Sequence, residues 1–203
     1  MEIRDIEGAI EGILFASGEP VPIERIAAVL AVDKELIEDT ACRLMDWYSF
    51  ERRGIRLLRL ENTLQLCSAP EYADSIRLAL ETRKPPQLTQ PALEVLAIIA
   101  YFQPVTKAYI EQVRGVDSSY TVGLLQERGL IEPGGRLSVP GRPILYKTTK
   151  TFLRTFGISS IEELPNLPEA ETDTDGQLKI QNAIDLLSAE TKTISQAENP
   201  VEG

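Results

Sequence analysis

Few residues in this chain could carry out chemistry. The sequence has no histidine and only two cysteines, Cys42 and Cys67, which form no CxxC pair. Histidine is the commonest general base and metal ligand, and structural zinc sites are built from cysteine and histidine. Neither a GxxxxGK loop followed by Ser or Thr nor a GxGxxG motif occurs. We therefore expect no enzyme, cofactor, metal or small-molecule substrate, with carboxylate catalysis as the remaining alternative.

The composition bounds the class of protein and its compartment. Hydrophobic residues make up 43% and charged residues 26%, which argues against wholesale disorder. The longest uncharged run, Val95–Thr106, has twelve residues and is too short to span a bilayer. Acidic residues interrupt the apolar N-terminus, so we expect no signal peptide. Without a disulfide framework, the reducing cytoplasm is the expected location.

Charge is distributed unevenly. The formal net charge is −10, but residues 158–203 alone hold ten acidic residues against two lysines. Residues 84–157 hold nine basic and five acidic residues, whereas residues 1–83 hold ten basic and sixteen acidic ones. Because phosphate affinity depends on local cationic patches, a weak nucleic-acid contact stays open for the second segment and is not expected for the first.

The chain repeats itself at a shift of 84 residues. Seven identities fall within an 18-residue window, and the elements around that window agree as well. Such internal periodicity indicates two tandem copies of one unit. The matching residues are Ala16, Pro20, Val21, Ile26, Val29, Val32 and Asp33, which align with Ala100, Pro104, Val105, Ile110, Val113, Val116 and Asp117.

The first copy is predicted to form three helices and then a hairpin. Apolar residues from Ile3 recur at helical spacing, and Asp33 is expected to cap the third helix after a three-residue joint. Alternating residues then predict a strand over 63–67, with 55–60 as its partner strand across Glu61 and Asn62. Ser68 and Glu71 suggest a capping box before a closing helix.

The second copy follows the same order. Thr89 and Thr106 are expected to cap its first two helices, and Gly115 is expected to end the second. The helix after Thr89 is apolar on nearly every side, which predicts a central, buried element. Its hairpin is expected to turn at Gly134 and Gly135.

Three helices followed by a hairpin predict a winged helix, a helix-turn-helix variant. The predicted fold is therefore mainly α with small β wings. It comprises a first winged-helix domain at 1–82, a stiff linker at 83–88 and a second winged-helix domain at 89–157. An acidic tail at 158–203 is expected to be mostly disordered, with one weak amphipathic helix around Ile184.

The third helix of each copy is poorly suited to reading DNA. In the first copy it holds four acidic residues against Lys34 and Arg43, and in the second it offers Gln126 and Arg128 beside Glu127. The cations lie instead on the second hairpin and beyond it. They form either a solvated basic rim or a nonspecific contact for phosphates or an acidic partner. These residues are Arg136, Arg142, Lys147, Lys150 and Arg154.

Large aromatic residues near expected surfaces favour protein partners. Tyr48 already occupies the inward stripe of its helix, so Trp47, the residue before it, is expected to face outward. Tyr101 lies at the end of the buried helix of the second copy. Aromatic residues are common interface anchors. The alternative is that they close each small core.

Several motifs together resemble the bacterial segregation and condensation protein B (ScpB) family. The similarity spans roughly residues 5–168 and is strongest in the second copy. In chain order the segments are Ala9-Ile10, 13–21, 96–101, 103–106, Ile110, 114–118, Leu125, 127–131, 140–146, Thr148-Thr149, Phe152-Leu153, Phe156-Gly157, Leu164-Pro165 and Leu167-Pro168.

The resemblance implies a homodimer formed largely by the first domains and a kleisin, ScpA, bound mainly by the second. It implies a non-catalytic role in chromosome condensation and partition at the nucleoid, with ATP chemistry left to the SMC ATPase partner. Arg142, displayed by a Pro-Gly-Arg-Pro bend, and Tyr146, on the returning strand, join Trp47 and Tyr101 as candidate partner-binding residues, unless the bend is only a fixed turn. A DNA-binding transcription regulator is the competing function.

Overall fold

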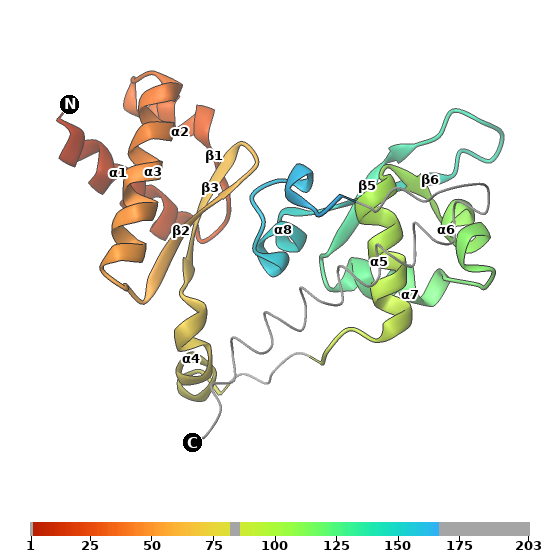
Figure 1. The fold of residues 1–203 in the computed structure, drawn as a ribbon. Coiled ribbons are helices and arrows are strands. Elements are labelled where there is room, and N and C mark those ends of the chain that lie inside the picture. The colour runs from red at the N-terminus through yellow and green to blue at the C-terminus, as the bar shows by residue number, and fades with distance from the viewer. Residues whose placement is uncertain (1, 82–85, 167–203) are drawn as a thin grey trace. The chain divides into compact units, whose positions relative to one another are not determined.

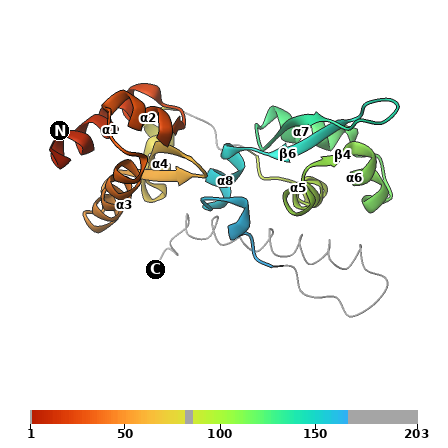
Figure 2. The same ribbon diagram turned by 90° about the horizontal axis from the view of Figure 1, so that it is seen from above.

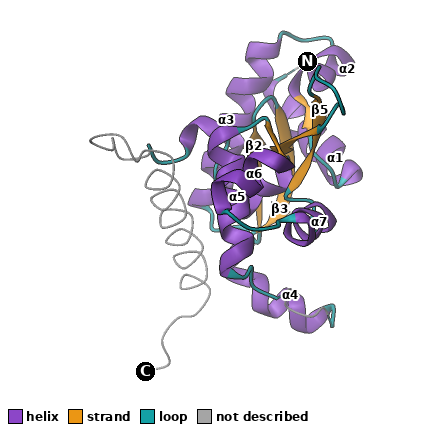
Figure 3. Ribbon diagram, turned by 90° about the vertical axis from the view of Figure 1, so that its right-hand side faces the viewer, coloured by secondary structure: helices purple, strands orange, loops and turns teal. Residues whose placement is uncertain are grey.

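A computed structural model of the chain describes residues 2–81 and 86–166. Contacts within the chain separate two compact units, which divide between Lys84 and Pro85 (Figure 1). Each unit is mostly helical and carries one small three-stranded sheet, as the secondary-structure colours of Figure 3 show. The prediction of a mainly α fold with small β sheets is therefore confirmed. Of the tail predicted at 158–203, the part after residue 166, with the predicted weak helix, lies outside the described residues.

The first unit places three helices ahead of a hairpin. Helix α3 follows α2 after a three-residue joint, and β2 pairs with β3 across Glu61 and Asn62, as predicted. Strand β1 adds a third, antiparallel strand beside β3. With two residues it is too short to show any alternation, and the sequence analysis missed it. The elements are α1 (Ile3–Ser17), β1 (Val21–Pro22), α2 (Ile23–Leu30), α3 (Lys34–Phe50), β2 (Ile55–Leu60), β3 (Thr63–Ser68), η1 (Pro70–Tyr72) and α4 (Ala73–Ala79).

Helix α1 buries the apolar stripe that its helical spacing predicts. Ile6, Ile10 and Leu14 are at most 1% exposed and pack in one cluster with residues of α2, α3 and the hairpin. Gly18 ends the helix in the left-handed conformation, with φ at 66°, and its N–H donates to the Leu14 carbonyl. That conformation is strained for a residue with a side chain, so Gly18 is well suited to this position.

The second unit repeats this order. Helix α5 is buried on nearly every side, as predicted, with eight of its thirteen residues in the core. In Figure 2, α5, α6 and α7 lie beside strands β4 and β6. The elements are α5 (Gln90–Phe102), β4 (Val105–Thr106), α6 (Lys107–Arg114), α7 (Ser119–Glu127), β5 (Ile131–Arg136), β6 (Ile144–Thr148), α8 (Lys150–Phe156) and η2 (Ile161–Glu163).

Within the matching window, the elements coincide at the 84-residue shift found in the sequence. Strand β1 maps onto β4, and α2 maps onto α6, residue for residue. The sheet orders also correspond, β1-β3-β2 in the first unit and β4-β6-β5 in the second.

The predicted helix caps are only partly right. Asp33 and Thr89 occupy N-cap positions, but neither side chain forms the capping hydrogen bond. The capping box of Ser68 and Glu71 is wrong, because the Glu71 carboxylate pairs with an arginine of β2 and α4 starts further along. Thr106 does cap α6, accepting a backbone N–H at 3.2 Å.

The predicted turn of the second hairpin is also wrong. Gly134 and Gly135 lie within β5, and the chain reverses over residues 137–143 instead. The register shifts between Pro133 and Gly135, which marks a β-bulge. Proline has no N–H for the ladder, and Gly135 has φ at 126°, a conformation open to glycine. These residues therefore form an irregularity within a strand and not a turn.

The second unit extends beyond its predicted end at residue 157. Leu164 is 9% exposed, and the Tyr101 hydroxyl donates a hydrogen bond to the Pro165 carbonyl at 3.0 Å. Residues 158–203 are predicted to be mostly disordered because of their acidic composition, but they include an apolar pair, Leu164-Pro165, that packs on the second unit.

Candidate functional site

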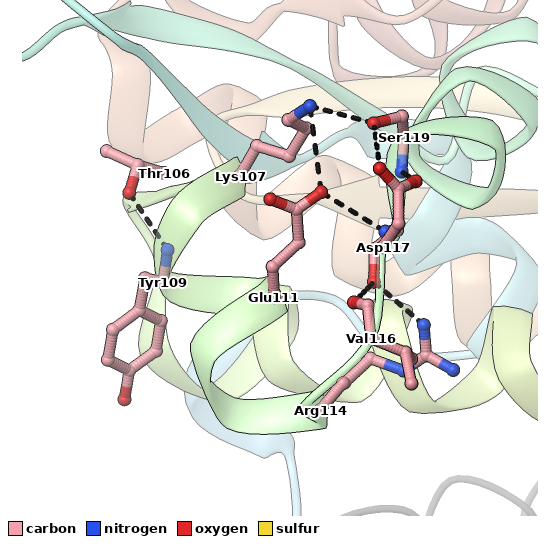
Figure 4. Close-up of polar contacts among 9 residues, drawn as sticks. Thr106, Lys107, Tyr109, Glu111, Arg114, Val116, Asp117 and Ser119 are labelled. Carbon is pink, nitrogen blue, oxygen red and sulfur yellow. Dashed lines mark hydrogen bonds and ion pairs between the residues drawn. The ribbon is translucent and has the colours of Figure 1, made fainter.

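The α6–α7 helix pair of the second unit is held by a cluster of polar side chains (Figure 4). Helix α6 begins at the Thr106 cap, whose hydroxyl accepts the Tyr109 N–H. It ends at Gly115, which has φ at 70° and donates its N–H to the Glu111 carbonyl at 2.8 Å. Thr106 and Gly115 therefore begin and end α6 through hydrogen bonds to its own backbone, as predicted. The residue at which the turn to α7 starts is set by Gly115.

The outer part of the cluster neutralises Lys107. Its Nζ lies 2.7 Å from the Ser119 hydroxyl and 3.6 Å from the Glu111 carboxylate. Asp117 accepts both the Ser119 N–H, at 2.9 Å, and the Ser119 hydroxyl, at 3.2 Å. These hydrogen bonds hold the pKa of Asp117 below its ordinary value. The lysine is therefore engaged within its own chain.

The inner part of the cluster ties the turn to α5. Two guanidinium nitrogens of Arg114 lie 3.0 and 3.2 Å from the Glu94 carboxylate, and the third donates to the Ser118 hydroxyl at 2.8 Å. Ser118 is 1% exposed, and its N–H donates to Glu111 at 3.2 Å. The segment Arg114–Ser118, part of the resemblance above, fixes the angle between α6 and α7.

Helix α7, the second helix of this pair, presents little positive charge. Ser119–Glu127 contains neither lysine nor arginine, and Arg128, just after it, donates to the Pro86 carbonyl at 2.8 Å. Its most exposed large side chain is Tyr120, at 82%. A helix of this composition offers phosphates almost no electrostatic attraction.

Helix α3 of the first unit is acidic on its solvent side. Lys34 lies 3.4 Å from the Glu24 carboxylate, and Arg43 lies 4.0 Å from that of Glu7. Of its other charged side chains, Glu38 pairs with Arg59 at 2.9 Å, and Glu35, Asp39 and Asp46 are exposed. This surface would repel a DNA backbone.

The β5–β6 hairpin is cationic. Lys147 lies 3.2 Å from Glu132 on the facing strand, and Arg136 donates to the Arg142 carbonyl at 3.1 Å. Arg142 is exposed, and its φ of 39° places it in the left-handed region. The expectation that the bend displays Arg142 agrees with this placement.

Trp47 and Tyr48 are adjacent on α3 but lie in different environments. Trp47 is 42% exposed, with the Arg53 guanidinium 4.9 Å from its ring centroid. Tyr48 is buried, packs edge-on against Trp47 and donates its hydroxyl to Glu11. Burial, and then the Glu11 hydrogen bond, raise the pKa of Tyr48 well above its ordinary value. Trp47 is therefore available to a partner, and Tyr48 is a core residue.

The structure gives the other two sequence-predicted tyrosines internal roles. Tyr146 lies on the returning strand, β6, as expected, but it is 8% exposed and faces the core of the unit. Tyr101 is half-buried and holds Pro165 through its hydroxyl. Alternation along β6 could have indicated the inward position of Tyr146. The charged Lys147 is expected to face solvent, and its neighbour in a strand then faces the other way, toward the core.

Sequence reasoning missed several exposed apolar side chains. Phe15 on α1 is 84% exposed, and Val116, in the α6–α7 turn, is 54% exposed next to the exposed Tyr120. The available signal was helical phase. Phe15 lies one residue after Leu14, the last buried position of its stripe, and therefore points away from the core.

No helix in residues 2–81 or 86–166 is both long and apolar enough to cross a membrane. The same residues contain no group of three or more potential metal ligands arranged to hold an ion.

Comparison with known proteins assigns the chain to a family. Residues 8–167 match the family model described as segregation and condensation complex subunit ScpB. The chain belongs to the ScpB family. Segregation and condensation protein B of Ruminiclostridium cellulolyticum is 44% identical to it over 185 residues, covering 91% of this chain and 96% of that protein.

Solved structures of ScpB proteins are also similar. The crystal structure of ScpB from Mycobacterium tuberculosis is 26% identical, with a TM-score of 0.39, over 78% of this chain and 98% of that one. A dimer of an ScpB N-terminal domain complexed with an ScpA peptide is 27% identical, with a TM-score of 0.36, over 38% of this chain and 96% of that one.

Proposed function

We propose that this ScpB-family chain is a non-catalytic architectural subunit of a bacterial SMC–kleisin complex. It binds the kleisin ScpA as a homodimer and reaches the SMC ATPase through ScpA. It acts in the cytoplasm, at the nucleoid, in chromosome condensation and segregation. The observation that carries this proposal is the family match over residues 8–167, which includes nearly every described element.

We further propose that each unit is a winged helix. The helix-turn-helix pairs are α2 with α3 and α6 with α7, and the wings are the β2–β3 and β5–β6 hairpins. In this assignment the first unit supplies the dimer interface and the second unit grips the kleisin. Helix-turn-helix surfaces accept helices and strands of partner proteins when they do not bind DNA.

The charge of the third helices supports protein partners over a DNA duplex. Helix α3 is acidic on its solvent side, and α7 has no basic residue. A protein that holds DNA must instead place several lysines or arginines against phosphates. Direct DNA contact by this subunit is therefore weak or absent in the proposed function.

Of the four sequence-predicted residues, Trp47 and Arg142 have side chains that a partner can reach. We assign Trp47 to the dimer or kleisin contact of the first unit and Arg142 to the kleisin contact of the second. Tyr101 and Tyr146 support the surface of the second unit from within that unit.

Light scattering and titration with a purified ScpA fragment test the proposal. We expect a dimer that binds ScpA, and we expect Trp47→Ala or Arg142→Ala to weaken one of these associations by about tenfold. Arg25→Ala, which removes an exposed cation from α2, is the matched control and should bind like the parent chain. A monomer that does not bind ScpA would refute the proposal. Tight, sequence-selective DNA binding at physiological salt would favour the transcription regulator instead.

A further inference from the structure

The second hairpin and the helix after it form a stretch of one charge sign. Residues 133–161 contain five basic residues and no acidic residue. Within the described chain, Lys147 pairs with Glu132, whereas the bond from Arg136 goes to a neutral carbonyl. Positive charge therefore accumulates toward the tip of the hairpin, around Arg136 and Arg142.

The tip also exposes aliphatic side chains between its arginines. Leu137 is 42% exposed and Val139 is 44% exposed. We call the exposed part of this hairpin, which carries Arg136, Leu137, Val139, Arg142 and Lys147 on its two faces, the cationic hairpin surface. It suits an acidic segment that also carries apolar residues.

This chain contains such a segment. Residues 167–203 hold eight acidic residues and two lysines, a formal net charge of −6. Glu169, Glu171, Asp173 and Asp175 occupy alternate positions. In an extended backbone they would share one face, roughly 7 Å apart. Leucine and isoleucine residues follow at 178–187.

The segment starts within reach of the cationic hairpin surface. Pro165 is tied to Tyr101 at the end of α5, and Gln103, two residues on, accepts hydrogen bonds from Thr148 at the base of β6. From Thr148 to Arg142 is about 20 Å along an extended strand, and residues 167–175 can span about 30 Å. A tether of this length gives an effective concentration on the order of millimolar.

We propose that the acidic segment 167–203 docks on the cationic hairpin surface of its own chain and shields that surface from nucleic-acid phosphates. The attraction between the two is electrostatic and therefore weakens as salt is added. This inference does not rest on the proposed role in an SMC–kleisin complex. A kleisin segment bound at Arg142 would compete with the docked segment.

Zero-length carbodiimide cross-linking tests the docking directly. The full chain, as an equal mixture of unlabelled and ¹⁵N-labelled protein without ScpA, is cross-linked at low salt and analysed by mass spectrometry. We expect amide links from Lys147 or Lys150 to carboxylates at 169–175, within molecules of one label. The pair of Lys147 and Glu132 supplies an internal positive control. Absence of links to the segment, or mixed labels in about half of the linked pairs, as random pairing of separate chains gives, would overturn the proposal.

Binding to a 20-base-pair DNA duplex of arbitrary sequence tests the shielding. Changing the four alternating acids to Asn or Gln in the full chain should tighten binding at least about fivefold at low salt. Adding Arg136→Gln and Arg142→Gln should remove that gain. The matched control neutralises four exposed acids of the first unit that lie outside α3: Glu19, Glu51, Glu61 and Glu81. If the control tightens binding equally, net charge alone explains the effect and the shielding is refuted.

Discussion

Tyr48 carries an interaction that a phenylalanine could not make. Its buried hydroxyl joins α3 to α1 by donating to Glu11, and burial, followed by this hydrogen bond, raises the pKa of Tyr48. We expect Tyr48→Phe to lower the free energy of unfolding by about 1–2 kcal/mol near neutral pH, measured with urea. Tyr72→Phe, an exposed tyrosine in the same unit, should change it by less than about 0.5 kcal/mol. Equal losses in both variants would contradict the assigned role.

The same residue predicts a dependence on alkaline pH. The folded-state pKa of Tyr48 is raised above that of the unfolded chain, which is about 10. The unfolded state therefore releases its proton first, and stability falls as pH rises above about 10. In Tyr48→Phe this contribution is absent, so its unfolding free energy should fall less steeply between pH 10 and 12. An unchanged slope would show that Tyr48 does not control alkaline stability.

Individual site residues were only partly predictable from the sequence. Helical phase separated Trp47 from Tyr48, because adjacent residues on a helix point about 100° apart. Alternation along β6 is a signal for the inward position of Tyr146, whereas the role of Tyr101 depends on Pro165, 64 residues away. Contacts at that separation leave no local pattern.

At the scale of elements, the α6–α7 turn depends on one nearly buried ion pair. Arg114→Ala would leave the Glu94 carboxylate and the buried Ser118 hydroxyl without that donor. We expect a loss of about 2–3 kcal/mol in the free energy of unfolding of the second unit. Lys107→Ala removes the exposed pair with Glu111 and should cost less than about 1 kcal/mol. Urea unfolding followed by circular dichroism compares the two. Similar small losses would show that Arg114 does not hold the turn.

Elements with a strong period were predictable, and short or irregular ones were not. The stripe of α1 and the polar–apolar alternation of residues 63–67 each repeat several times, and β2 is predicted as the partner of that alternating strand. Strands β1 and β4 have two residues each and exist because β3 and β6 offer them an edge. The paired glycines of β5 favour a turn locally, but the register of the hairpin places them in a bulge.

At the scale of the whole molecule, two separate cores predict two unfolding transitions. Ile10 and Ile98 are both fully buried, one in each unit. An Ile→Val change typically costs about 0.5–1.5 kcal/mol. In a domain of this size such a loss lowers the transition temperature by roughly 5 °C. By calorimetry, Ile10→Val should lower only one transition and Ile98→Val only the other, because each cavity affects the packing of its own core. The two changes form a matched pair, each removing one methylene. A single transition that both variants lower equally would mean that the units unfold as one cooperative body, and the division into two units would then not describe the stability of the chain.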